Sequence, residues 1–252
     1  MAKRISVGAG SPRPARLKKP SISAFFPAYN EEANIGALCL KTASVLKGIA
    51  GQWEVIAVND GSKDRTAAVV EGLHKKEPRI RVVSHAVNAG YGAAVKTGFA
   101  SAKHDWIFFT DGDGQFNVEE MAKFLPYLAD HDLVVGYRID RADPAIRKLN
   151  AWAWGTLVRT LFQLKGVRDI DCAFKFVRRD VFKKFKLETT GAMISTELLV
   201  KSSKNGLRLM ELGVNHYPRR AGVQTGAKLS VIARAFKELF SYFIRWQRFG
   251  YR

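Results

Sequence analysis

The chain has 252 residues, 47% of them hydrophobic, which is enough to bury the core of one large α/β domain or two small ones. Its formal net charge of +18 indicates an anionic partner, either nucleic acid, anionic lipid or a phosphorylated substrate. The composition excludes a disulfide framework, because there are only two cysteines, and no apolar stretch approaches the roughly 18 residues of a membrane-spanning helix.

Residues 1–20 carry many basic side chains and no acid, and they lack the apolar core of a signal peptide. We expect them to form a disordered basic tail. A mitochondrial presequence fits the charge, but its prolines fit poorly with an amphipathic helix. We expect Cys39 and Cys172 to be buried small residues of a protein in a reducing compartment.

From residue 21 onward, strand-like and helix-like patterns alternate. Apolar or β-branched runs predict strands at 22–29, 53–59, 80–85, 106–111 and 133–137, and helical patterns lie between them at 32–46, 64–75, 91–102 and 118–128. The second half predicts a helix at 144–164, a strand at 173–177, a helix at 195–204 and a strand at 207–217. This alternation indicates one α/β, Rossmann-like domain over residues 21–228, with a mostly parallel sheet flanked by helices.

The last segment, 229–252, predicts a separate amphipathic helix over 229–249. Its apolar stripe consists of Leu229, Ile232, Phe236, Leu239, Phe240, Phe243 and Trp246, and the opposite stripe is almost wholly basic. Such a helix suits the lipid interface, and the Trp-rich 150–164 segment could lie beside it. Ordinary packing on the sheet is the alternative for both segments.

Two carboxylates, Asp111 and Asp113, follow an apolar strand and are separated by Gly112. In extended backbone their side chains would point to the same side, where they suit a hard divalent cation that also binds substrate phosphates. A plain Asp-Gly turn is the alternative. A calcium loop is excluded, because its required Gly and Glu positions hold Phe116 and Ala122.

Two other predicted strands also end in acidic residues. The first runs into Pro27-Ala28-Tyr29-Asn30-Glu31, and the second into Asn59-Asp60-Gly61-Ser62 followed by Asp64. Ligands of such sheets bind beyond the carboxyl ends of the strands. We expect Glu31 to accept hydrogen bonds from ribose hydroxyls and Asp60 from a base N–H, and we expect Asp64 to cap a helix.

These motifs, together with Asn88-x-Gly90-x-Gly92 and Asp111-Gly112-Asp113-Gly114-Gln115, resemble the family-2 inverting glycosyltransferases of the GT-A fold. More narrowly, they resemble dolichyl- or polyprenyl-phosphate mannosyl- and glucosyltransferases, over about residues 21–228. The resemblance implies a nucleotide-sugar donor, Mg²⁺ or Mn²⁺, a lipid phosphate acceptor and inversion at the sugar. From the basic amphipathic segment 229–249, with no spanning helix after it, we expect a peripheral protein on the cytosolic face of a membrane. The sequence leaves a membrane-embedded partner subunit open.

Carried over position by position, the resemblance implies that Asp111, Asp113 and Gln115 hold the metal, with Asp113 also catalytic. The positions that it places around the donor are Pro27, Tyr29, Glu31, Asp60, Asp111 and Gly112, and it places Gly90 and Gly92 beside it. For the two glycines of the 88–92 segment, an ordinary strand-to-helix turn is equally compatible.

Downstream, Arg220-Ala221-Gly222-Val223-Gln224-Thr225-Gly226-Ala227-Lys228 resembles the family's R-x-x-G-x-[ST]-K loop, although Lys228 follows Thr225 by three residues. We expect Arg220 and Lys228 to contact phosphates as catalytic cations. Arg147 is a second candidate for the lipid phosphate, and a solvated surface cation is the alternative for each.

The acceptor decides whether a general base is needed. A phosphate monoester is largely ionised near neutral pH and needs none, whereas a saccharide hydroxyl requires a carboxylate base. Glu197 is the first candidate for that base, with Asp169 and Asp171 as others, and helix capping is the favoured alternative for Glu197. A basic nucleic-acid-binding protein is a distant third hypothesis, because it leaves the acidic strand ends unexplained.

Overall fold

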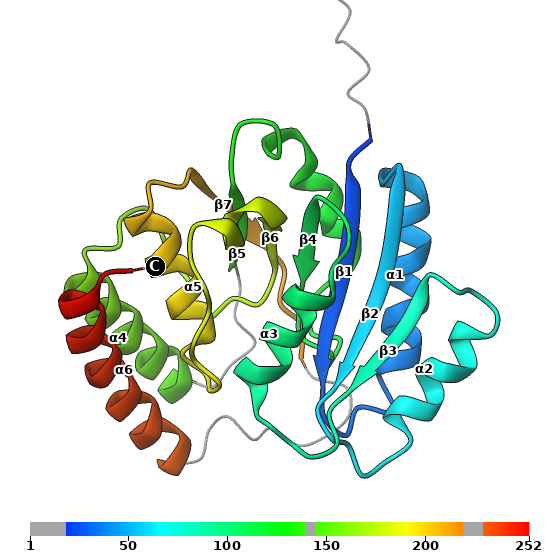
Figure 1. The fold of residues 1–252 in the computed structure, drawn as a ribbon, viewed down its shortest axis with the longest axis horizontal. Coiled ribbons are helices and arrows are strands. Elements are labelled where there is room, and N and C mark those ends of the chain that lie inside the picture. Colours follow the sequence, from blue (N-terminus) through cyan, green and yellow to red (C-terminus); the bar gives the residue numbers. More distant parts are fainter. Residues whose placement is uncertain (1–18, 140–144, 219–228, 252) are drawn as a thin grey trace, which may run out of the picture.

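The structure, a computed structural model, describes residues 19–139, 145–218 and 229–251. A seven-stranded sheet in the order β3-β2-β1-β4-β6-β5-β7 forms its centre (Figure 1). The strands are β1 (Ser21–Ala28), β2 (Gln52–Asn59), β3 (Ile80–Ser84), β4 (Trp106–Phe109), β5 (Leu133–Arg138), β6 (Lys175–Arg178) and β7 (Leu209–Val214). Among these strands only β6 runs antiparallel to its neighbours, so the prediction of a mostly parallel sheet in one α/β domain is confirmed.

Helices cover both faces of the sheet. They are α1 (Ile35–Ile49), α2 (Thr66–His74), α3 (Tyr91–Ser101), α4 (Ala145–Phe162), α5 (Ile194–Lys204) and α6 (Leu229–Phe249), with short 3₁₀ helices η1 (Val118–Lys123), η2 (Leu125–Tyr127) and η3 (Arg179–Lys183). The chain steps from β1 to β3 in one direction and then returns to β4 on the other side of β1. Because such crossovers are right-handed, α1 and α2 lie on one face and α3 lies on the opposite face (Figure 1).

The carboxyl ends of β1, β2, β3 and β4 meet at one edge of the sheet, since these strands are parallel. The antiparallel strand β6 brings its amino end to the same edge, where Lys175 pairs with Phe109. All the strand-end motifs of the sequence therefore lie along this edge, as the alternating pattern predicts.

Two predicted elements differ from the structure. The predicted strand at 106–111 ends at Phe109, where pairing with both β1 and β6 stops. The predicted helix at 118–128 is wrong, because this segment forms η1 and η2 instead. Pro126 has no N–H to donate back along a helix, and Asn117 caps η1 by accepting a hydrogen bond from the Glu119 N–H, so short 3₁₀ turns replace an α-helix.

The cysteines behave as the composition predicts. Cys39 and Cys172 are both free and fully buried. Burial raises the pKa of each thiol to about 12, so neither is a reactive thiolate near neutral pH.

Close packing of α3 on β1 depends on Gly98. A Cβ at this position would lie 2.2 Å from Cδ2 of Phe25, whose ring is held between Phe99 and Phe109 at centroid distances of 5.0 and 5.4 Å. We expect Gly98→Ala to lower the free energy of unfolding by about 1–3 kcal/mol, because a well-packed core cannot yield easily. Chemical denaturation measures this change.

The matched control for that prediction is Gly72→Ala, at an exposed position of α2 where an added Cβ meets nothing within 4 Å. It should raise the free energy of unfolding by about 0.5–1 kcal/mol through lower chain entropy. Equal effects of the two substitutions would contradict the packing argument.

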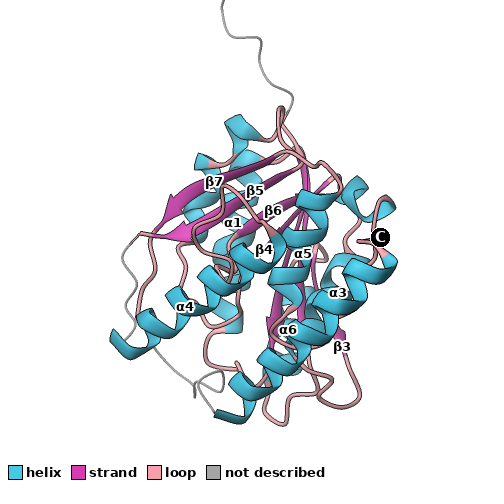
Figure 2. Ribbon diagram, turned by 90° about the vertical axis from the view of Figure 1, so that its left-hand side faces the viewer, coloured by secondary structure: helices cyan, strands magenta, loops and turns pink. Residues whose placement is uncertain are grey.

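The C-terminal helix α6 packs on the body of the domain beside α4 (Figure 2). Leu239 and Trp246 are fully buried, and the Trp246 ring lies 5.5 Å from the ring of Phe162 in α4. These two residues of the predicted apolar stripe therefore belong to the core and do not face lipid. Within the described residues, no helix is long and apolar enough to cross a bilayer.

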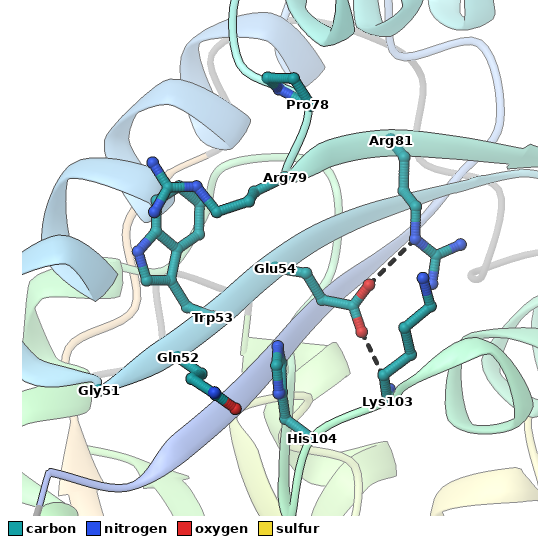
Figure 3. Close-up of a pocket in the computed structure, with 9 residues that line it drawn as sticks. All are labelled: Gly51, Gln52, Trp53, Glu54, Pro78, Arg79, Arg81, Lys103 and His104. Carbon is teal, nitrogen blue, oxygen red and sulfur yellow. Dashed lines mark hydrogen bonds and ion pairs between the residues drawn. The ribbon is translucent and has the colours of Figure 1, made fainter.

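A hollow of about 470 Å³ opens at the opposite edge of the sheet, near the amino ends of β2 and β3 (Figure 3). Its two arginines are already engaged. The Arg81 guanidinium lies 3.0 Å from the buried carboxylate of Glu54, which also accepts the Lys103 N–H, and Arg79 lies 4.1 Å over the ring of Trp53. These contacts brace β2, β3 and the segment before β4, far from the edge that carries the acidic motifs.

Candidate active site

The two carboxylates of the Asp-Gly-Asp motif lie in a turn directly after β4. The backbone turns at Gly112 and Asp113, and Asp113 Oδ1 accepts a hydrogen bond from the Gln115 N–H at 3.1 Å. A Cβ on Gly112 would lie 2.8 Å from the carbonyl oxygen of Pro27, so glycine lets this turn pack against the end of β1. A turn, rather than the alternation of extended backbone, therefore positions Asp111 and Asp113.

Gln115 links this turn to the segment after β7. Its Nε2 donates to the Tyr217 carbonyl at 2.9 Å, and the Tyr217 N–H donates back to the Gln115 carbonyl at 2.9 Å. Because the amide nitrogen of Gln115 faces Tyr217, its amide oxygen points away from Tyr217. The predicted phosphate contacts of Arg220 and Lys228 lie outside the described residues, as does the side chain of Arg147 in α4.

Tyr91, at the start of α3, belongs to the site although no motif singled it out. Its hydroxyl donates to Asp111 Oδ1 at 2.9 Å. Burial, and then the negative charges of Asp111 and nearby acids that include Asp171, raise the pKa of Tyr91 well above its ordinary value. The hydroxyl therefore remains a neutral donor to Asp111.

Asp60, only 3% exposed, organises the loop after β3. Its carboxylate accepts the N–H groups of Ala89 and Gly90 at 2.8 and 2.9 Å, and Nδ1 of His85 lies 2.7 Å from Oδ1. A carboxylate offers about four lone-pair sites, so three donors leave room for one more. The expected contact with a base N–H stays a prediction.

The segment between β1 and α1 contacts the start of α2. Glu31 is buried; its N–H donates to Thr66 Oγ1 at 2.9 Å and its carboxylate accepts Nδ2 of Asn34 at 2.7 Å. Tyr29, two residues earlier, is 40% exposed. Asp64 accepts the N–H of Thr66, the first residue of α2, at 2.9 Å, but the N-cap position itself is Arg65.

The amino end of β6 adds a buried cation and a carboxylate to this edge. Lys175 is fully buried, and its Nζ donates to the carbonyl oxygens of Cys172 and Ile170. Burial lowers the pKa of Lys175, while nearby acids oppose this shift. Nε and Nη2 of Arg138 donate to the two carboxylate oxygens of Asp169 at 2.6 and 2.7 Å. Asp171, in contrast, is exposed.

Glu197 does not fit the role of a general base. It is fully buried, its two oxygens accept the N–H groups of Glu188 and Thr189 at 2.8 Å each, and Nζ of Lys201 lies 3.0 Å away. It does not cap its own helix either, since α5 begins at Ile194 and Glu197 lies within its first turn. Its carboxylate instead anchors a loop that precedes the helix.

The donor set around the 111–113 turn fits Mg²⁺ or Mn²⁺. Two partly exposed carboxylates and the amide oxygen of Gln115 are hard oxygen ligands, which these cations prefer. In the described part of the chain, no group of three or more His, Cys, Asp or Glu residues could hold a metal by itself. Such a sparse set matches a cation that is shared with substrate phosphates rather than enclosed by protein.

Comparison with known proteins identifies the family. Residues 23–186 match the profile of glycosyl transferase family 2. The chain is 33% identical over 171 residues to a dolichyl-phosphate beta-glucosyltransferase of Trichomonas vaginalis, covering 61% of this chain and 50% of that protein. It is 28% identical to the dodecaprenyl-phosphate galacturonate synthase of Rhizobium johnstonii, covering 90% and 68% of the two chains.

A solved structure shares the fold. Glucosyl-3-phosphoglycerate synthase from Mycobacterium tuberculosis, crystallised with Mn²⁺, UDP and glucosyl-3-phosphoglycerate, superimposes with a TM-score of 0.69 at 20% identity, over 88% of this chain and 79% of that one. The predicted GT-A architecture is thereby confirmed. The chain spans about half to two thirds of the length of the curated relatives. The family match covers well over half of the sequence, and the chain therefore belongs to glycosyl transferase family 2.

Proposed function

We propose that this chain transfers a sugar from a nucleotide-sugar donor to a polyprenyl or dolichyl phosphate, with Mg²⁺ or Mn²⁺ and with inversion at the sugar. Family membership and the names of its relatives support the reaction class. The observation that supports the proposal is the close approach of the 111–113 turn to Pro27, because the two acidic residues of this turn then lie beside the 27–31 segment at the edge where ligands of such sheets bind.

In this proposal, different residues at this edge of the sheet bind different parts of the donor. Asp111, Asp113 and Gln115 hold the cation and, through it, the diphosphate. Tyr29, Glu31 and Asp60 surround the base and ribose. When bound, the cation neutralises the negative charge that develops on the leaving nucleoside diphosphate.

A phosphate acceptor suits the absence of an accessible base at Glu197. A phosphate monoester, with a second pKa of about 6, attacks as an anion and needs no proton removed. Glu197 is saturated with hydrogen bonds from the loop that it anchors and is closed to solvent. In this proposal, Glu197 shapes the site by holding that loop in place.

A saccharide hydroxyl acceptor is the second candidate, and exposed Asp171 is the observation that favours it. Asp171 interacts electrostatically with Tyr91 and with Lys175, so it lies near the Asp111 carboxylate. A hydroxyl acceptor would need such a carboxylate as general base.

The test is a donor screen with purified protein, Mn²⁺ or Mg²⁺, and either a short polyprenyl phosphate or a free saccharide. UDP- and GDP-sugars are supplied one at a time, and products are identified by mass spectrometry. Glycolipid formed from one donor supports the proposal. Product formed only with the saccharide, and lost in Asp171→Asn, would favour the second candidate.

A surface on α6 supports attachment to a membrane. Phe236, Phe240 and Ile244, spaced by four residues, are 40%, 48% and 66% exposed and form one stripe. Trp152 of neighbouring α4 is 65% exposed, and Phe236 lies 5.4 Å from Trp154 of the same helix. Exposed cations of α6 flank this stripe, so we propose that the protein binds the cytosolic face of an anionic membrane peripherally.

We expect Phe240→Asp combined with Ile244→Asp to weaken vesicle binding at least about tenfold, because two apolar side chains lose their lipid contact and gain charge. Flotation with vesicles containing phosphatidylserine measures it. Leu40→Asp, at a 53% exposed position of α1, is the control and should bind like the unchanged protein. Equal binding by all three proteins would show that the stripe does not face lipid.

A further inference from the structure

A buried ion pair on α5 holds the loop formed by residues 186–191. Glu197 and Lys201 are both fully buried, one helical turn apart, and their charged atoms lie 3.0 Å apart. Glu197 accepts the N–H groups of Glu188 and Thr189, and the Thr189 hydroxyl, at 2.8 Å each. Lys201 donates to the Glu188 carboxylate at 2.9 Å. In a buried setting such a saturated network fixes the loop backbone.

The far end of this 186–191 loop lies against the start of α3. The Thr190 carbonyl accepts the N–H of Gly92 at 2.9 Å. A Cβ on Gly92 would lie 2.6 Å from the Gly191 carbonyl oxygen, and one on Gly90 would lie 2.9 Å from that of Thr190. Backbone meets backbone here, so the Gly-x-Gly pair serves the seating of this loop, and a side chain at either position would displace it.

Tyr91 lies between those two glycines and connects the 186–191 loop to Asp111. Its backbone is fixed by the loop on one side, and its hydroxyl donates to Asp111 Oδ1 at 2.9 Å. A hydrogen bond to a carboxylate is shorter and stronger than one between neutral groups. The route from Glu197 to Asp111 is therefore a continuous series of packed backbone and directed hydrogen bonds.

We propose that Tyr91 and Glu197 are positioning residues for the metal-binding turn. Glu197 fixes the 186–191 loop, the loop fixes the first turn of α3, and the Tyr91 hydroxyl sets the orientation of the Asp111 carboxylate toward the divalent cation. This proposal rests on the proposed function, because it assigns the cation to Asp111. It gives a positioning role to two residues outside the proposed metal-binding set of Asp111, Asp113 and Gln115.

Tyr91→Phe tests the proposal, since it removes one hydroxyl and keeps the ring. The measurement is calorimetric binding of UDP, and separately of GDP, with and without Mn²⁺, together with electron paramagnetic resonance of free Mn²⁺. We expect the gain in nucleotide affinity that Mn²⁺ provides to fall about tenfold or more, as for a lost hydrogen bond to a charged group. Affinity without Mn²⁺ should stay unchanged.

Tyr127→Phe is the matched control, because it removes a tyrosine hydroxyl in η2 that takes no part in these contacts. Gly92→Ala is the second variant; by displacing the loop it should reproduce the Tyr91→Phe loss. A Tyr91→Phe protein that gains as much affinity from Mn²⁺ as the control would overturn the proposal, as would an equal loss with and without Mn²⁺. Should the unchanged protein bind neither nucleotide with Mn²⁺, the proposed function itself fails.

Discussion

Asp113→Asn is expected to reduce turnover by about 10²–10³-fold at saturating donor, the range seen when one preorganised electrostatic contact to a developing charge is lost. The substitution keeps the size of the side chain and an oxygen that can accept the Gln115 N–H, so the turn persists while half of the carboxylate pair is neutralised. The Mn²⁺ concentration that gives half-maximal activity should rise as well. Steady-state kinetics over a Mn²⁺ series measures both effects.

The control for that prediction is Asp130→Asn, which neutralises an exposed carboxylate in the connection after η2. Both variants should melt within a degree or two of the unchanged protein, because Asp113 is partly exposed and its turn is retained. Full activity in Asp113→Asn at limiting Mn²⁺ would exclude this residue as a metal ligand, and the metal role of the whole motif with it.

Much of this edge is readable from local sequence, because local pattern and strand polarity determine it. Strand ends of parallel strands must meet, so the acids after β1, β2 and β4 could be assigned to one edge without coordinates. The contact of Asp64 with the start of α2 was also local, because its partner Thr66 is two residues away, although the N-cap is Arg65. The antiparallel direction of β6 was not predictable from the sequence, since it depends on pairing with β4 and β5.

The parts that sequence could not supply are those made by distant segments. Tyr91 looks like an ordinary helix residue until the fold brings it to Asp111, twenty residues later. Glu197 carries a carboxylate at a helix start, which suggested a base or a cap, and only its tertiary burial shows that it binds the N–H groups of Glu188 and Thr189. An amphipathic stripe likewise does not show which of its residues face the core. In α6, Leu239 is buried in the core, whereas the neighbouring Phe240 is exposed.

Glu197→Ala is expected to lower the free energy of unfolding by about 3–5 kcal/mol, the range for removing one partner of a buried ion pair. Lys201 would remain fully buried with only the carboxylate of Glu188 beside it, and two loop N–H groups would lose their acceptor. For a domain of this size that corresponds to a fall in melting temperature of roughly 6–20 °C. Chemical denaturation gives the free energy and calorimetry the temperature.

A double-mutant cycle separates the ion pair from the loop contacts. Glu197→Gln and Lys201→Met should each destabilise strongly, and together by less than the sum, because the double variant buries no unpaired charge. Lys183→Met, which breaks the exposed pair of Lys183 with Asp180, should change nothing measurable. Strict additivity of the two buried changes would mean that Glu197 stabilises the 186–191 loop through its backbone hydrogen bonds alone. The positioning of α3 and Asp111 would then depend on those two N–H groups and not on Lys201.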